Sequence, residues 1–167
     1  MSRAFVKEPD GGPPEDEIPE RRVSEHPNHV TPAGLRQLED EIGRLRAERL
    51  RVAADEDEAD AGERLAHLDR ELRYFVGRLE SAVLVAHRAT DEVAFGAQVR
   101  VRGSDGTERR FAIVGEDEAD VASGKVSYVS PLAQALLGAH VGDTVTWQRP
   151  AGDLQLTIVA LDDPDTQ

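Results

Sequence analysis

Two runs of apolar residues, spaced alternately three and four positions apart, constrain this chain more than any other feature of its sequence. The first run is Leu35, Leu38, Ile42 and Leu45, with Arg49 and Val52 at the next two positions, and the second is Leu65, Leu68, Leu72, Phe75, Leu79 and Ala82. This spacing places each run on one face of an α-helix, as in the seam of a coiled coil. The connection between the runs is too short for anything but an antiparallel hairpin.

The hairpin has a defined start and a defined length. Thr31 is a residue type that caps helices, and Pro32 suits the first helical position. Each helix of about 20 residues would be roughly 30 Å long at 1.5 Å per residue. We therefore predict a helical stalk over residues 31–86. An ordinary helical bundle is the alternative, but the remaining sequence has no further long helix to complete one.

The turn of this hairpin is strongly acidic. Residues 54–63 include no basic residue and carry the carboxylates of Asp55, Glu56, Asp57, Glu58, Asp60 and Glu63. Carboxylates crowded in this way repel one another, which favours an exposed tip. A solvated charge run is the simplest interpretation of the composition. The alternative is that some of these groups supply oxygen ligands to Mg²⁺, which takes only one or two from a protein, and so complete a metal site in another molecule.

The pattern changes from helical to alternating after residue 91. Predicted strands, separated by glycine-containing turns or polar loops, cover residues 93–102, 107–114, 125–129, 144–147 and 154–161. A short helix over residues 132–137 follows Ser130 and Pro131, which suit its cap and first position. These elements indicate a compact α+β domain over residues 91–161. Within that domain, the acidic segment 115–124 is predicted to be a loop.

The first thirty residues are polar and rich in proline. Their few apolar side chains are scattered and cannot offset the entropy lost on ordering. We therefore predict that residues 1–30 form a disordered tail. A docking peptide is the alternative.

Composition limits the classes of function. The net charge of −13 argues against general adhesion to nucleic acid or to an anionic membrane. No apolar run approaches a membrane span, and the N-terminus lacks an apolar signal-peptide core. There is no cysteine, no Gly-x-Ser-x-Gly elbow and no phosphate-binding glycine loop, and the five histidines are scattered. These features predict a cytoplasmic protein that is not a nucleophilic enzyme.

Three stretches carry a resemblance to a known family. Residues 31–41 are similar to a helix-opening pattern Thr-x-x-Gly-x-x-x-Leu-x-x-Glu, and residues 93–99 look like the strand that opens the family's second domain. Residues 130–138, followed by Val141-Gly142-Asp143 and Pro150-Ala151-Gly152, are similar to the signature Ser-Pro-x-x-x-Ala-Leu-x-Gly, Gly-Asp, Pro-x-Gly. Over about residues 31–161 the chain resembles the bacterial Gre transcript-cleavage and elongation factors, GreA and GreB.

The resemblance implies an α+β protein with an N-terminal antiparallel coiled coil and an FKBP-like C-terminal domain of about five strands and one short helix. In the family, that domain docks on RNA polymerase at the mouth of the secondary channel, and the coiled coil enters the channel. Acids at the tip help to hold a catalytic Mg²⁺ and activate water, so that the polymerase hydrolyses its own backtracked RNA. The factor is then not an enzyme by itself, and it binds no Mg²⁺ independently.

Carried over residue by residue, the resemblance implies roles for several side chains. Asp55 and Glu58 would be the catalytic acids, with Asp60 as a further ligand of the shared Mg²⁺. Polymerase contacts would involve Ser130, Pro131, Leu137 and Gly138, whereas Leu132 and Leu136 are better interpreted as core. Nascent RNA would lie near stalk arginines, namely Arg44, Arg46, Arg49, Arg51, Arg64, Arg70, Arg73 and Arg78, which otherwise pair with neighbouring acids. DNA would be met only through the polymerase complex.

The tip also departs from the family. Asp55 and Glu58 keep the Asp-x-x-Glu spacing, but the preceding Gly and the following Asn and Tyr are absent. The hairpin is about 14 residues shorter than usual, which removes roughly 10 Å of reach. A regulator that occupies the channel without promoting cleavage, as in the shorter-armed Rnk-type proteins, is therefore the main alternative. Prolyl isomerisation follows only from the fold name, and a fold does not confer an activity.

Overall fold

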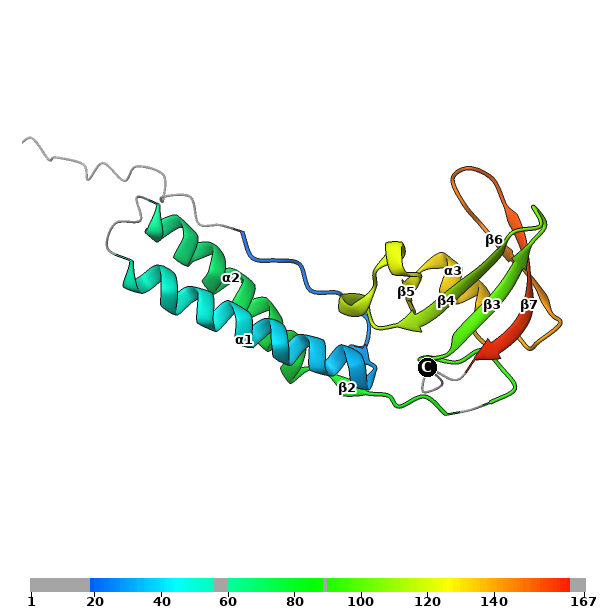
Figure 1. The fold of residues 1–167 in the computed structure, drawn as a ribbon, viewed down its shortest axis with the longest axis horizontal. Helices are drawn as coiled ribbons and strands as arrows, with labels where there is room; N and C mark the ends of the chain where they lie inside the picture. Colours follow the sequence, from blue (N-terminus) through cyan, green and yellow to red (C-terminus); the bar gives the residue numbers. More distant parts are fainter. Residues whose placement is uncertain (1–18, 56–59, 89, 163–167) are drawn as a thin grey trace, which may run out of the picture.

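The structure, a computed structural model, describes residues 19–55, 60–88 and 90–162. A helical hairpin projects from a small mixed domain, so the molecule is elongated (Figure 1). In chain order the elements are β1 (His29–Val30), α1 (Pro32–Ala54), α2 (Ala61–Glu80), β2 (Val83–Leu84), β3 (Gln98–Gly103), β4 (Glu108–Val114), the 3-10 turns η1 (Glu116–Glu118) and η2 (Val121–Ser123), β5 (Lys125–Ser127), α3 (Pro131–Leu136), β6 (Thr144–Trp147) and β7 (Leu154–Asp162). The predicted α+β fold class is confirmed.

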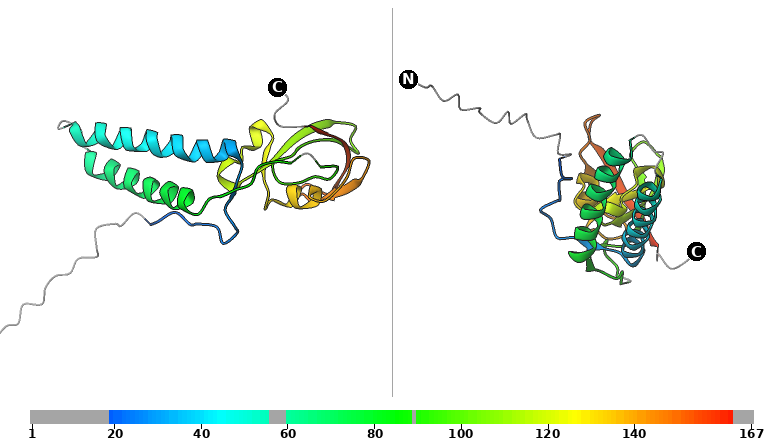
Figure 2. Two further views of the ribbon diagram at one scale, coloured as in Figure 1. Left: turned by 90° about the horizontal axis from the view of Figure 1, so that it is seen from below. Right: turned by 90° about the vertical axis from the view of Figure 1, so that its left-hand side faces the viewer.

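The stalk consists of α1 and α2, which lie side by side along the apolar seam (Figure 2). On α1 the buried apolar residues include Leu38, Ile42, Leu45 and Val52, all of which the heptad spacing predicts. Leu45, Val52 and Leu68 form the centre of an apolar cluster, and the remaining contacts come from Ala61, Leu65, Leu72 and Phe75. Thr31 caps α1 by accepting a hydrogen bond from the backbone N–H of Gly34, and Pro32 stands at the first turn.

The prediction of a disordered tail is wrong for its last residues. Asn28 and Val30 are buried, and β1 pairs in parallel with β2. The N–H groups of Val83 and Val85 donate to the carbonyls of Asn28 and Val30 at 2.8 and 2.9 Å. A two-residue strand is too short to show alternation in the sequence, which is why the pattern missed it. Residues 1–18 lie outside the described part of the chain.

The mixed domain is a five-stranded sheet in the order β5-β4-β3-β7-β6. Neighbouring strands are antiparallel except β4 and β5, which are parallel. One face of the sheet carries the core, and α3 contributes Leu132 and Leu136, which are buried as predicted. The most deeply buried side chains on the strands are Val99, Val101, Ile113, Leu156 and Ile158.

Two details of this domain differ from the prediction. The first strand was expected from residue 93 but begins at Gln98, because the chain turns at Gly96, whose φ is +84°. The segment predicted to be a loop contains η1 and η2, and Glu118 within it is buried. Among the described residues, no helix is both long enough and apolar enough to cross a membrane.

Candidate functional site

The tip of the hairpin is framed by two carboxylates. Asp55 is the residue after α1, and its N–H donates to the carbonyl of Val52 at 3.3 Å. Asp60 stands immediately before α2, and its carbonyl accepts from the N–H of Arg64 at 3.0 Å. Both residues are exposed. The third predicted acid, Glu58, lies outside the described residues.

The chemistry of these groups suits an ion shared with another molecule. The described residues contain no group of three or more His, Cys, Asp or Glu side chains that could hold a metal ion. Asp55 and Asp60 offer carboxylate oxygens, the ligand type that Mg²⁺ prefers, and Mg²⁺ usually takes one or two of them while keeping waters or substrate phosphates. The carboxylates of Asp55 and Asp60 could therefore contribute oxygen ligands to an Mg²⁺ site.

Behind the tip, the two helices are connected by ion pairs across the hairpin. Arg49, the charged residue in the apolar seam, donates from Nε to Oδ1 of Asp69 at 2.5 Å. This hydrogen bond is the main cause of the raised pKa of the Arg49 guanidinium. Arg64 reaches Glu48 in the same way at 3.0 Å. Because all four side chains are partly exposed, these pairs contribute little to the free energy of unfolding.

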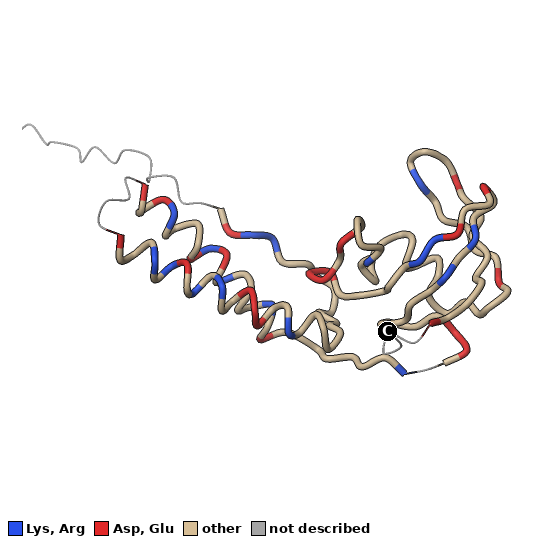
Figure 3. Tube along the Cα trace, in the orientation of Figure 1, with Lys and Arg blue, Asp and Glu red and all other residues tan. Residues whose placement is uncertain are grey.

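Most of the other stalk arginines are also paired. Basic and acidic residues alternate along both helices (Figure 3). The further pairs of the stalk arginines are Arg44 with Glu41 and Glu48, Arg70 with Glu71, Arg73 with Glu20, and Arg78 with Glu116 and Asp117. Within the described part of the chain, Arg46 and Arg51 form no ion pair. Of the eight arginines that the resemblance placed near RNA, these two are the best available for such a contact.

Where the stalk meets the mixed domain, a buried arginine joins them. Arg78 of α2 is 2% exposed, and its Nε donates to Oδ2 of Asp117 in η1 at 2.5 Å. The other carboxylate oxygen of Asp117 accepts from the hydroxyl of Tyr74 at 2.6 Å. Burial, reinforced by this hydrogen bond, raises the pKa of Tyr74 to about 12. A buried guanidinium needs such a partner, so the pair fixes η1 against α2.

A second buried acid fixes η1 against the start of α1. Glu118 is 7% exposed, and it accepts a hydrogen bond from the hydroxyl of Thr31. Its other oxygen lies 3.4 Å from the ammonium of Lys125. Gly34 makes room for this carboxylate, because a Cβ at that position would lie 2.6 Å from Oε2 of Glu118. Thr31 and Gly34, the Thr and Gly of the helix-opening pattern, therefore both contribute to this contact with Glu118.

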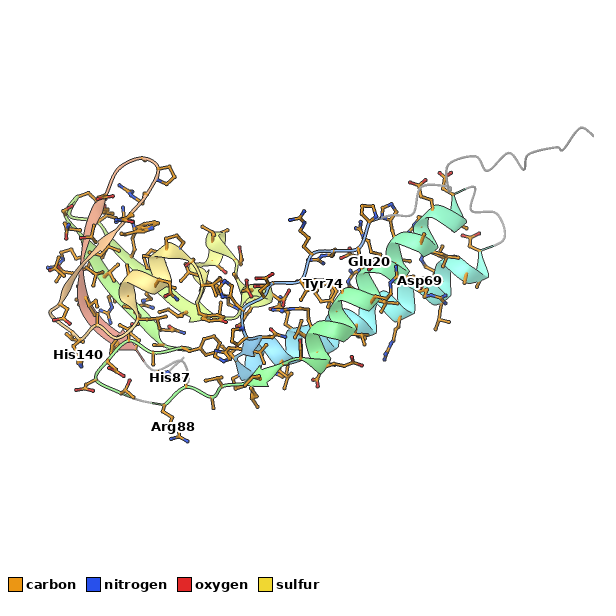
Figure 4. The ribbon with its side chains drawn as sticks, turned by 180° about the vertical axis from the view of Figure 1, so that it is seen from behind. Glu20, Asp69, Tyr74, His87, Arg88 and His140 are labelled. Carbon is orange, nitrogen blue, oxygen red and sulfur yellow. The ribbon has the colours of Figure 1, made fainter. Side chains whose placement is uncertain are left out.

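The end of the N-terminal segment lies between the two parts. The ring of His29 stacks on that of Tyr128 with 5.3 Å between centroids, and the Tyr128 hydroxyl donates to the carbonyl of Pro27 at 2.5 Å. On the stalk side, Asn28 donates to the carbonyl of Arg78 at 2.6 Å. Further towards the N-terminus, Glu20 lies beside α2 near Tyr74 (Figure 4). We call this contact region, formed by residues 27–31, Arg78 and η1, the joint.

The sequence missed the joint almost entirely. The sequence predicts a loop at Asp117 and Glu118 and a disordered tail that includes residues 27–30. The one available signal was Arg78, which lies beside the seam residue Leu79 and could not be buried without an acidic partner. Nothing in the sequence identified which of the many carboxylates that partner would be.

The four residues predicted to contact polymerase gather around α3, where most have a structural role. The Ser130 hydroxyl caps α3 by accepting from the N–H of Ala133 at 3.2 Å, and Pro131 is the exposed first residue of the helix. Leu137 ends the helix and packs against the core, and Gly138 adopts a φ of +80°. Their role in polymerase binding stays a prediction.

Comparisons with known proteins agree with the resemblance. The family described as "Transcription elongation factor, GreA/GreB, C-term" matches residues 88–163. Transcription elongation factor GreB of Neisseria meningitidis serogroup B is 36% identical over 156 residues, covering 83% of this chain and 96% of that protein. GreA of Alkalilimnicola ehrlichii is 38% identical over 148 residues, covering 78% and 94%.

Among solved structures, GreA factor homolog 1 of Thermus thermophilus matches with a TM-score of 0.41 and 23% identity, over 83% of this chain and all of that one. A likeness this weak carries no argument about function. The GreB and GreA matches are much stronger, and they span both the stalk and the mixed domain. This chain belongs to the Gre family of transcription elongation factors.

Proposed function

We propose that this protein binds RNA polymerase at its secondary channel and, through the acids at the hairpin tip, promotes Mg²⁺-dependent cleavage of backtracked nascent RNA. The observation that supports this most is the placement of Asp55 and Asp60 at the exposed end of a two-helix stalk. In a family of transcription elongation factors, such a stalk can present acids inside another protein's active site. The chain acts as a cofactor of the polymerase, and the polymerase remains the enzyme.

Each residue of the tip has a limited task. Asp55 and Asp60, together with Glu58, would supply oxygen ligands to an Mg²⁺ held jointly with the polymerase. When bound, Mg²⁺ supplies Lewis-acid stabilisation of the charge that develops on a phosphodiester during hydrolysis. The carboxylates of this chain also accept hydrogen bonds from water and orient it. Arg46 and Arg51 on α1 would contact the phosphates of the nascent RNA.

A channel-occupying regulator without cleavage activity is the second candidate, and a specific observation favours it. The GreB match spans 156 residues but uses 83% of this 167-residue chain, about 139 residues. About 17 positions of that relative therefore have no counterpart here. This deficit is of the size expected from the shortened hairpin. With 23 and 20 residues, α1 and α2 extend only about 30–35 Å at 1.5 Å per residue.

The deciding experiment is transcript cleavage on a backtracked elongation complex of the cognate polymerase. It compares the wild type with the Asp55→Asn/Glu58→Gln double variant, which removes two charges at nearly constant side-chain volume. Asp40→Asn is the matched control, because Asp40 is exposed on α1 and far from the tip. We expect cleavage with the wild type and the control, and a loss of at least about 100-fold with the double variant, because charge stabilisation in an active site is worth that much.

The other outcomes separate the two candidates. If the wild type produces no cleavage but competes with an active Gre factor for the polymerase, the regulator is correct and cleavage by the tip is excluded. If the double variant cleaves as well as the wild type, these acids have no catalytic role. Failure of the wild type to bind polymerase at all would overturn both candidates.

A further inference from the structure

A cavity of about 360 Å³ lies beside the joint, between the start of the stalk and the sheet. Its walls come from the first residues of α1, the linker that follows β2, and strands β3, β4 and β5. The polar side chains in these walls are those of Thr31, Arg36, His87, Gln98, Glu118 and Lys125. Figure 4 labels His87 on the linker between the stalk and the mixed domain. The tip is at the opposite end of the stalk, so this cavity is separate from the proposed function.

Several hydrogen-bonding groups in this cavity have unused capacity. Within the described ranges, the Arg36 guanidinium forms no ion pair and the Gln98 amide forms no side-chain hydrogen bond. The Nδ1 atom of His87 is buried and has no hydrogen-bond partner. Such a buried polar atom is costly unless a ligand or water satisfies it. Arginine, a side-chain amide and an imidazole N–H can all donate hydrogen bonds, so the cavity favours a ligand rich in acceptors.

The charge of the cavity also favours an anion. Glu118 is the carboxylate in its lining, and that carboxylate is already engaged by Thr31 and Lys125. Among the described residues, the positive charge of Arg36 is therefore not compensated by a carboxylate. Ala33, in the first turn of the long helix α1, also lines the cavity, and the positive end of the helix dipole reinforces the preference for an anion.

The adjoining face of the sheet extends the positive region. Gln98 of β3 pairs with Ala112 of β4, which pairs with Lys125 of β5, so this row forms one wall of the cavity. Two residues further along the same face, Arg100 and Arg110 stand directly opposite each other. They share a single carboxylate, that of Asp162, at 2.9 and 3.8 Å. Like charges paired across strands are unfavourable without a counter-ion, so one arginine remains available to an added anion.

We propose that this cavity binds a phosphate group carried by a nucleotide or by RNA. Phosphate presents only acceptors, and its hydrogen bonds with arginine and lysine are charge-assisted. The volume lies at the lower end of the range of about 300–1,000 Å³ found for small-ligand sites, which suits a mononucleotide or one nucleotide of a strand. Because the net charge of the chain is −13, a local group of cations is needed for an anion to bind.

The test uses the full chain and three probes: inorganic phosphate, ATP, and a short oligouridylate without terminal phosphates. Binding is measured by calorimetry, and the amides that respond are identified in ¹⁵N–¹H spectra. Arg36→Gln is the test variant, and Arg22→Gln is the matched control, because Arg22 is also exposed, forms no ion pair with another described residue and lies outside the cavity. We expect Arg36→Gln to weaken binding about tenfold or more and Arg22→Gln to leave it unchanged.

The probes distinguish the sources of the phosphate. Binding of ATP without the oligouridylate supports a free nucleotide, and the reverse supports RNA. In either case the amides of Gln98 and His87 should shift. Binding that is equally strong in Arg36→Gln and wild type would overturn the proposal, as would the absence of any binding with a Kd below about 1 mM. A failure here leaves transcript cleavage by the tip unaffected, because the two assays measure different ends of the molecule.

Discussion

The joint and the tip use the same residue types in opposite ways. At the joint, the side chains of Asp117 and Glu118 are 12% and 5% exposed, and each is paired with a group from the stalk or its cap. At the tip, Asp55 and Asp60 are exposed and flank the turn between the helices. An acidic composition therefore does not by itself indicate a ligand site. Acids that face a buried cation hold the fold together, whereas the exposed carboxylates of Asp55 and Asp60 lie where another molecule can reach them.

The largest effect that tests this comparison is expected from Arg78. Arg78→Met removes the cation and leaves Asp117, whose side chain is 12% exposed, without its charge partner. Breaking a buried pair in this way typically costs about 3–5 kcal/mol of unfolding free energy. Arg49→Met is the matched variant in the stalk, where the partner Asp69 is partly exposed, and it should cost less than about 1 kcal/mol. Urea denaturation followed by circular dichroism measures both. Equal losses would show that the joint is no more important to stability than an ordinary surface pair.

Smaller changes in the free energy of unfolding are expected when two glycines of α1 are replaced by alanine, and the two changes should have opposite signs. Gly34→Ala places a Cβ within 2.6 Å of the Glu118 carboxylate, which Thr31 and Lys125 hold in place. The resulting overpacking should exceed the gain in helix propensity and destabilise by about 1–2 kcal/mol. Gly43→Ala meets nothing within 4 Å and should stabilise by about 0.5–1 kcal/mol. Thermal unfolding compares the two, and a stabilising Gly34→Ala would mean that Glu118 moves aside freely.

Local periodicity explains why the stalk and the sheet could be predicted. The seam through Leu38, Ile42 and Leu45 and the alternation of Val99 with Val101 are each contained within a few consecutive residues. Arg49, which the heptad spacing places at a seam position, is partly exposed and pairs across the hairpin with Asp69. These features could be predicted because burial repeats with the period of the element.

The joint could not be predicted for the converse reason. Arg78 and Asp117 are 39 positions apart, and Thr31 and Glu118 are 87 apart. In a chain with 33 acidic residues, the sequence alone does not indicate which distant carboxylate pairs with a given arginine. The two-residue strand β1 is too short to have a periodicity of its own, and its partners are distant in sequence: it pairs with β2, and the preceding Pro27 accepts a hydrogen bond from Tyr128. At the tip, residues 56–59 lie outside the described part of the chain, and the roles of the acids stay predictions.

Alkaline pH offers a smaller perturbation that acts on the joint alone. The pKa of Tyr74 is raised to about 12 by burial and by its hydrogen bond to Asp117. The folded state therefore keeps this proton at a pH where the unfolded chain, with a tyrosine pKa near 10, has lost it. The contribution to stability is complete below about pH 10 and disappears as the pH rises towards 12. Tyr74→Phe should flatten this part of the stability profile, as measured by urea denaturation at several pH values.

The spectroscopic control for this prediction is the ultraviolet titration of the phenols. The chain has two tyrosines, and burial raises the pKa of Tyr128 as well. The wild type should therefore show no phenolate transition at the pKa of a free tyrosine, and Tyr74→Phe should remove the later part of the absorbance change. A wild-type transition near pH 10 that Tyr74→Phe removes would show that Tyr74 is not held by Asp117.

The smallest effect on stability is expected at the tip. The comparison is between Asp60→Asn at the tip and Asp117→Asn at the joint. Asp60→Asn removes a charge that the start of α2 favours, but it also relieves repulsion from the neighbouring acids. These terms are small and opposed, so the free energy of unfolding should change by less than about 0.5 kcal/mol. Asp117→Asn weakens a charge-assisted bond to buried Arg78 and should cost at least about 1.5 kcal/mol. In the transcript-cleavage assay, Asp60→Asn should cause a larger loss of activity than Asp117→Asn, because Asp60→Asn removes a proposed Mg²⁺ ligand. A variant at Asp60 that lost stability but kept cleavage would mean that the tip, like the joint, is structural.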